Sequence, residues 1–131
     1  MLLHDTSASR PTIAASLDQI MRQVEYPCFA NLRTGYIDPF YKEICLVISE
    51  VFLMNPDDTI KVSGSVTSIR LVQEIYTQLR NEHIRLVYVN FQGVSDRVYN
   101  KKAYLRSALY NSVFEIVSHF VNTDYADLPT D

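Results

Sequence analysis

The sequence predicts an all-α domain, a compact bundle of about five helices with at most one short extended segment near residues 59–63. Apolar residues recur at three- and four-residue steps over several stretches, which is typical of helices with one buried face. Clusters containing Pro, Gly, Asn or Asp separate these stretches and indicate short connections. With 131 residues, 47% of them apolar, the chain can bury one continuous core but is too short for two independent ones.

The chain is expected to hold a single helical domain over residues 12–124. Residues 1–11 mix Ser, Thr, Asp and Arg without apolar periodicity, which predicts a flexible leader. Residues 125–131 are predicted to be a flexible tail.

The first two helices are marked by clear start and stop signals. An amphipathic pattern begins at Ile13 and continues to Val24, and Pro27 is expected to end this helix. Asp38 then offers an N-cap, and the following Pro39 suits a first helical position because its missing N–H would have no partner there. The helix that follows runs to Met54, and so much of its surface is apolar that we expect it to be the central one.

The middle of the chain combines one extended segment with two further helices. Residues 59–63 alternate and are β-branched, which predicts a short strand ended by Gly64, and no second strand of comparable quality follows. Helices are predicted over residues 66–79 and 82–91, with Ser65 and Asn81 as their caps.

A last long helix is predicted to begin near Asn100, its N-cap, and to run to about Val121. Its apolar positions recur with helical spacing and should face the core. The predicted core face consists of Tyr104, Leu105, Ala108, Leu109, Ser112, Val113, Ile116 and Phe120.

Signals for catalysis are weak. His4, His83 and His119 are not paired with another His or a Cys at metal-ligand spacing, and we expect the last two at surface or boundary positions. Three scattered glycines cannot form a phosphate-binding loop. We therefore expect a protein that is not an enzyme and uses no cofactor or metal.

The cysteines and the hydropathy pattern indicate in which cellular compartment the protein is expected. Cys28 and Cys45 lie among apolar neighbours without Cys-x-x-Cys spacing, so we expect both to be buried free thiols. No signal peptide is recognisable, and no window approaches the roughly 20 apolar residues of a membrane span. A cytoplasmic protein without membrane contact is expected.

Charge is segregated along the chain. The formal net charge of −3 divides into +4 between Arg70 and Arg106 and −7 over the remaining residues. The densest basic segment lies at the predicted start of the last helix, where positive side chains oppose the positive end of the helix dipole. This placement suggests a site for an acidic partner, formed by Arg97, Lys101, Lys102 and Arg106. The alternative is a solvated helix face without a partner.

Three segments resemble the C-terminal domain of RepA-type replication initiators, which occur on plasmids and conjugative elements of Gram-positive bacteria. The resemblance covers roughly Asp38 to Asn122. Its motifs are Ile60-x-Val62-x-Gly64, Leu79-x-x-x-His83-Ile84-x-x-Val87 and Val98-x-Asn100-x-Lys102-x-Tyr104-Leu105-x-x-Ala108-Leu109-Tyr110-Asn111. The family usually has a proline shortly after the Asn111 position, where this chain has Val113, so we expect the final helix to continue without a break.

The resemblance implies a helical domain similar to the DnaD-like modules of Gram-positive primosomes. In such initiators a separate winged-helix domain binds origin DNA, whereas the C-terminal domain is associated with host replication proteins, with primase the expected contact. The leading hypothesis is therefore a protein-binding module that recruits replication machinery. Two alternatives remain open: sequence-independent DNA binding, which would depend steeply on salt, and homodimerisation through the apolar second helix.

Overall fold

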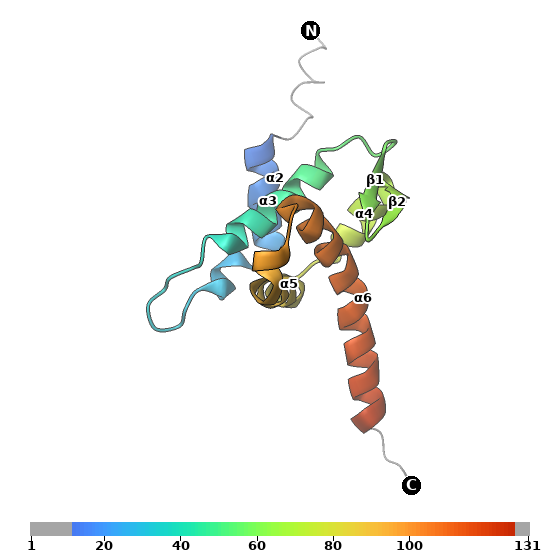
Figure 1. The fold of residues 1–131 in the computed structure, drawn as a ribbon. Helices are drawn as coiled ribbons and strands as arrows, with labels where there is room; N and C mark the ends of the chain where they lie inside the picture. The colour runs from blue at the N-terminus through green and yellow to red at the C-terminus, as the bar shows by residue number, and fades with distance from the viewer. Residues whose placement is uncertain (1–11, 128–131) are drawn as a thin grey trace.

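The computed structural model describes the backbone of residues 12–127 and the side chains of residues 12–116. Figure 1 shows that helices dominate and that one small hairpin lies at the edge of the body. The elements are α2 (Ile13–Gln23), η1 (Tyr26–Phe29), α3 (Phe40–Phe52), β1 (Thr59–Val62), β2 (Ser65–Ser68), α4 (Ile69–Tyr76), α5 (Asn81–Val94), η2 (Ser95–Arg97) and α6 (Lys101–Asp127). The predicted helical bundle is confirmed. The predicted leader, residues 1–11, lies outside the described residues, and of the predicted tail only 125–127 are described, as the end of α6.

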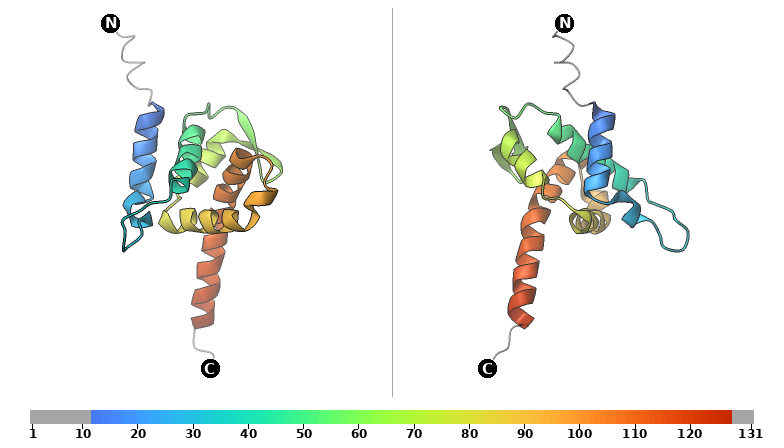
Figure 2. Two further views of the ribbon diagram at one scale, coloured as in Figure 1. Left: turned by 60° about the vertical axis from the view of Figure 1, so that its left-hand side comes forward. Right: turned by 180° about the vertical axis from the view of Figure 1, so that it is seen from behind.

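Helix α3 is the central element, as predicted. It contacts α2, α4, α5 and α6, and Figure 2 shows it lying between α2 on one side and α6 on the other. Ile44, Cys45, Ile48 and Val51 have no exposed surface. Burial of this largely apolar helix on several sides explains why its sequence lacks a wide polar face.

The start of α3 follows its sequence signal. The Asp38 Oδ1 atom accepts a hydrogen bond from the backbone N–H of Phe40 at 3.0 Å, which satisfies one of the free donors of the first turn. The helix ends at Phe52, before Asn55 and Pro56, where proline disfavours helical angles in the residue that precedes it.

Residues 59–68 form a two-stranded antiparallel hairpin, in which Thr59 faces Ser68 and Val62 faces Ser65. The second strand differs from the prediction, which places residues 66–68 in the following helix. That helix, α4, begins at Ile69, and its cap is Ser68, whose Oγ accepts from the backbone N–H of Leu71 at 3.0 Å. The predicted start, with Ser65 as cap, is therefore wrong by three residues.

The hairpin turn uses positive φ angles at both central residues, Ser63 (54°) and Gly64 (80°), as tight turns between twisted strands require. Glycine adopts this conformation readily, whereas serine does so at a cost. Two hydrogen bonds from Ser63 to α6 offset that cost: its N–H donates to Ser107 Oγ and its Oγ donates to Asn111 Oδ1, both at 2.8 Å. The hairpin is thereby docked onto α6.

The start of α5 corrects two expectations. His83 is buried, with 7% of its surface exposed, and its Nδ1 accepts from the backbone N–H of Arg80 at 2.9 Å, so the predicted surface position is wrong. Asn81 does not cap its own helix. Its Nδ2 donates to the main-chain oxygen of Val24, at the end of α2, at 3.0 Å.

The cysteines differ from each other. Both are free thiols, but Cys28 is exposed and only Cys45 is buried. The expectation of a buried Cys28 is wrong because η1 places it at the surface although its sequence neighbours are apolar.

Helix α6 confirms its predicted start and extends beyond its predicted end. Asn100 Oδ1 accepts from the backbone N–H of Ala103 at 3.0 Å and caps the helix. Leu105, Leu109 and Val113 are buried on the core side. The helix continues without a break to Asp127, and Figures 1 and 2 show its backbone extending beyond the other elements. None of the described helices has the length and apolar character needed to cross a bilayer.

Candidate functional site

The structure brings two of the four predicted basic residues together. Lys101 and Lys102 lie in the first turn of α6, beside α3. Lys101 Nζ is 2.8 Å from Glu43 Oε1, and Lys102 Nζ is 2.9 Å from Glu50 Oε2. Two of the four residues of the predicted basic cluster are thus paired with acidic side chains of the central helix.

The other two residues lie apart from this pair. Arg97 belongs to η2, and its Nη2 donates to the main-chain oxygen of Gly93 at 3.3 Å. Arg106 lies one turn further along α6, where its main-chain oxygen accepts from the hydroxyl of Tyr76 at 2.8 Å. Its Nε atom is enclosed without a hydrogen-bond partner. Neither arginine lines the space between α3 and the start of α6.

That space is a small groove of about 140 Å³, which we call the α3–α6 groove. Its floor is apolar and its rim carries the two ion pairs. Glu43 and Glu50 are seven residues apart, two helical turns, and therefore lie on the same face of α3. The lining residues are Glu43, Leu46, Val47, Glu50, Lys101, Lys102 and Leu105.

The rim is electrically balanced. The repulsion between two lysines and the positive end of the α6 dipole is offset by the two carboxylates, which reach across from α3. Lys101 Nζ also lies over the rings of Phe40 and Phe91, at 4.7 and 5.4 Å from their centroids. The side chains remain substantially exposed, so each ion pair contributes at most about 1 kcal/mol to stability.

The site predicted from the sequence contains basic residues only and therefore lacks Glu43 and Glu50. A signal was present, because these are the two acidic residues of α3 and they share one face of an otherwise apolar helix. Their partners are 58 and 52 residues away in the chain, and no local pattern predicts that pairing.

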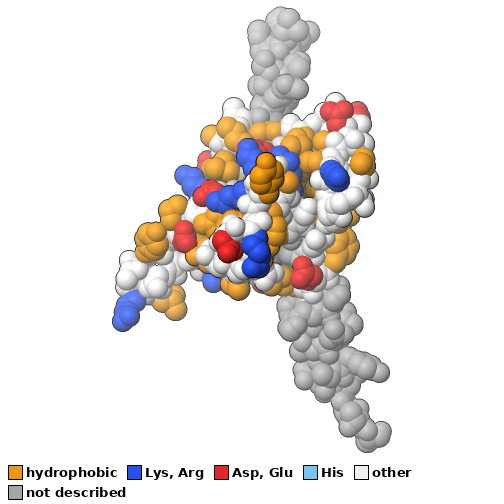
Figure 3. All heavy atoms as spheres, in the orientation of Figure 1, with side chains coloured by type: hydrophobic (Ala, Val, Ile, Leu, Met, Phe, Trp, Pro, Cys, Tyr) orange, Lys and Arg blue, Asp and Glu red, His pale blue; other side chains and the backbone are white. Residues whose placement is uncertain are grey.

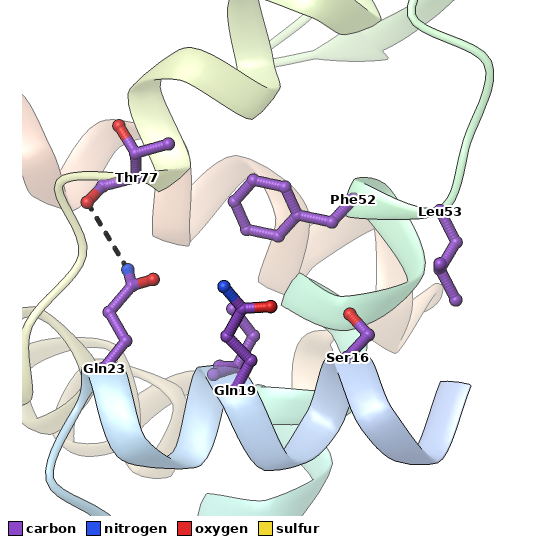
Figure 4. A pocket seen from close by; sticks show the side chains of 7 residues that line it. Ser16, Gln19, Gln23, Phe52, Leu53 and Thr77 are labelled. Atoms are coloured by element: carbon purple, nitrogen blue, oxygen red, sulfur yellow. Dashed lines mark hydrogen bonds between the residues drawn. The ribbon is translucent and has the colours of Figure 1, made fainter. Parts of the chain in front are cut away.

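A second hollow, of about 180 Å³, lies where α2 crosses the ends of α3 and α4 (Figure 4). None of the residues that line it is ionisable. Gln23, drawn there with its bond to Thr77, donates through Nε2 to the main-chain oxygens of Tyr76 at 3.1 Å and Leu79 at 2.9 Å. The Gln23 amide thus caps the end of α4, and we assign this hollow a structural role.

The part of the chain whose side chains are described contains no group of three or more His, Cys, Asp or Glu that could hold a metal ion. Burial raises the pKa of the Cys45 thiol to about 12, so the thiolate that nucleophilic chemistry needs is scarce at neutral pH. The α3–α6 groove itself presents apolar surface and exposed charges.

Fold and groove together define a small helical domain with a two-stranded hairpin and a charge-rimmed groove. The model of a family of unknown function, DUF6017, matches residues 4–130, and the chain belongs to this family. Comparison with curated proteins and with solved structures gave no match.

Proposed function

We propose that this chain is a non-catalytic protein-interaction module of a plasmid-type replication initiator, and that it recruits host replication machinery, primase above all, to an origin. The sequence resemblance to the C-terminal domain of RepA-type initiators supports the biological role. The α3–α6 groove supports the manner of binding.

The observation that carries the proposal is the combination of an apolar floor and an ion-paired rim in this groove. Protein interfaces commonly have an apolar centre and a polar, partly hydrated edge. A volume of about 140 Å³ suits one apolar side chain of a partner, resting on Leu46 and Leu105. The two ion pairs of the rim, which present both signs of charge, would then orient that partner through its own polar and charged groups.

The same pairing makes DNA the weaker candidate. Each lysine already holds a carboxylate within 3 Å, so a phosphate would have to displace an acidic side chain that stays nearby and repels it. Arg97 and Arg106 do not extend the groove into a continuous basic strip. Figure 3 shows acidic and basic side chains interspersed over the face that it presents, rather than a single basic stripe.

Homodimerisation was suggested by the largely apolar second helix, α3, and packing within the domain accounts for most of that apolar surface. Most of the apolar surface of α3 is buried within the domain against α2, α4, α5 and α6, which leaves little of it to pair with a second copy.

The test is titration calorimetry of this domain with purified primase from a Gram-positive bacterium. Replacing both Lys101 and Lys102 with Glu should weaken binding at least tenfold, because four carboxylates would then crowd the rim. Lys42→Glu provides the matched control, since Lys42 is an exposed lysine of α3 that does not line the groove. Circular dichroism should show the same helix content in all three proteins.

Fluorescence anisotropy with labelled single- and double-stranded DNA tests the alternative. We expect no binding by the natural domain at physiological salt. Strong binding that falls steeply with salt and disappears in the Lys101→Glu/Lys102→Glu variant would replace the proposal with direct DNA binding. Absence of primase binding would also refute the recruitment of primase.

A further inference from the structure

Residues 31–36 form a loop between η1 and α3, which we call the finger loop. Figures 1 and 2 show this segment extending away from the helical body. Residues 37–39 connect it to α3, whose Glu43 and Glu50 form the acidic part of the rim of the α3–α6 groove.

The finger loop is held in shape by its own hydrogen bonds. Asn31 Oδ1 accepts from the backbone N–H groups of Arg33 and Thr34 at 2.9 and 3.0 Å. The N–H of Gly35 donates to the main-chain oxygen of Asn31, and the N–H of Asn31 donates to that of Tyr36, both at 2.8 Å. Gly35 has a φ of +75°, a conformation that glycine adopts without strain. The loop is therefore pre-organised.

The base of the loop is fixed to the body by stacked aromatic rings. Phe29, which precedes the loop, stacks on Tyr41 of α3 with ring centroids 4.2 Å apart, and Tyr41 stacks on Tyr88 of α5 at 4.3 Å. On one side of the loop, Arg85 Nη2 donates to the main-chain oxygen of Cys28 at 2.6 Å. On the other side, the Tyr88 hydroxyl donates to Asp38.

The tip of this fixed loop presents apolar side chains to solvent. Leu32 is fully exposed, at 104% of its reference area, and Tyr36 is 64% exposed. Arg33 lies between them in the chain and is also exposed. Arg and Tyr, the residue types of Arg33 and Tyr36, are enriched at binding hot spots, and the exposed Leu32 adds apolar area beside them on a rigid projection.

We propose that the finger loop is a second docking element for a protein partner, in which Leu32 enters an apolar pocket while Arg33 pairs with a carboxylate at the edge of that pocket. This inference rests on the proposed recruiting function and adds a second contact to it. Arg33 is the one charged residue between positions 31 and 37, so the tip complements an acidic protein surface. A single cation is a poor basis for binding a phosphate backbone, whose affinity grows with the number of phosphates contacted.

The experiment is the same calorimetric titration with purified Gram-positive primase, using the full chain and finger-loop variants. Leu32→Ser and Arg33→Glu should each weaken binding about tenfold or more, because the first removes the apolar side chain from its pocket and the second places like charges together. Val89→Ser is the matched control, because Val89 is an exposed valine, 63% accessible, on α5. A third variant, Asn31→Ala, loosens the loop without changing its tip and should also weaken binding.

The outcomes separate this inference from the proposed function. If Leu32→Ser and Arg33→Glu leave primase binding unchanged, the proposed role of the finger loop is overturned, whereas the proposed role of the groove still stands. Complete absence of primase binding would overturn both. Binding of DNA that is lost in Arg33→Glu, measured by anisotropy, would overturn the protein partner in favour of nucleic acid. Unchanged thermal midpoints in Leu32→Ser and Arg33→Glu would show that the losses arise at the interface.

Discussion

Asp38 joins α3 and α5 through one carboxylate. Its Oδ1 caps α3 and its Oδ2 accepts from the hydroxyl of Tyr88 on α5. The Tyr88 hydroxyl and the backbone N–H of Phe40 both stabilise the ionised form, and together they lower the pKa of Asp38 below its usual value. The hydrogen bond to Asp38 is also the largest reason why the pKa of Tyr88 is raised to about 12.

The lowered pKa of Asp38 predicts that the free energy of unfolding depends on pH in the acidic range. A carboxyl whose pKa is lower in the folded state contributes fully above its unfolded pKa of about 4, and the contribution disappears as pH falls through the folded value. Tyr88→Phe should lower the free energy of unfolding by about 1 kcal/mol at pH 7, and this difference should shrink towards zero below about pH 4. Urea unfolding followed by circular dichroism at several pH values measures it.

Tyr99→Phe is the control for that substitution, because Tyr99 is fully exposed and its hydroxyl makes no hydrogen bond in the described structure. A Tyr88→Phe effect that stays constant from pH 7 to pH 2 would contradict the role of the Asp38 carboxylate.

At the scale of elements, amide side chains from one helix cap the C-terminal end of another. Asn81 of α5 donates to Val24 after α2. Gln23 of α2 caps the end of α4, and Gln73 of α4 donates through Nε2 to the main-chain oxygens of Val51 and Met54, at 3.0 and 3.1 Å, at the end of α3. The last carbonyls of a helix lack partners within it, so these amides fix both the ends of helices and their mutual positions.

Removing one such amide should lower the free energy of unfolding by more than an ordinary surface substitution does. Gln73→Ala breaks two hydrogen bonds in a half-buried position and should lower the free energy of unfolding by about 1–2 kcal/mol. Gln78→Ala is the matched control, since Gln78 is exposed and its side chain makes no described hydrogen bond. Equal midpoints for the two variants in urea would refute the capping role.

At the scale of the whole molecule, residues of the five described α-helices and of β1 share one continuous core. Tyr76, Leu79, Ile84 and Leu109 are completely buried although they come from different elements. Contacts among elements far apart in the chain make separate unfolding of one helix unfavourable.

This core predicts one cooperative unfolding transition. Far-UV circular dichroism and tyrosine fluorescence should give the same midpoint, and Leu109→Ala should shift both equally, by about 2–5 kcal/mol in unfolding free energy. Val89→Ala, on the exposed face of α5, should shift neither by more than about 0.5 kcal/mol. Two separate transitions in the natural protein would contradict a single core.

The sequence by itself determined the class of fold, the central place of α3 and the starts of α3 and α6. These features depend on apolar periodicity and on caps such as Asp38 and Asn100, whose bonds join residues two or three apart. A contact between residues so close in the chain can be predicted from the sequence, because the same helical turn positions both partners.

Only the tertiary structure decided how the charged residues are arranged. Lys101 and Lys102 stood out in the sequence, but their carboxylate partners, Glu43 and Glu50, come from a helix more than fifty residues earlier. The second hairpin strand, the burial of His83 and the exposure of Cys28 likewise depend on which elements lie beside them. Side-chain and strand pairings of this kind are made when distant segments meet, so their physical cause lies in the packing of the whole molecule and not in any local stretch of sequence.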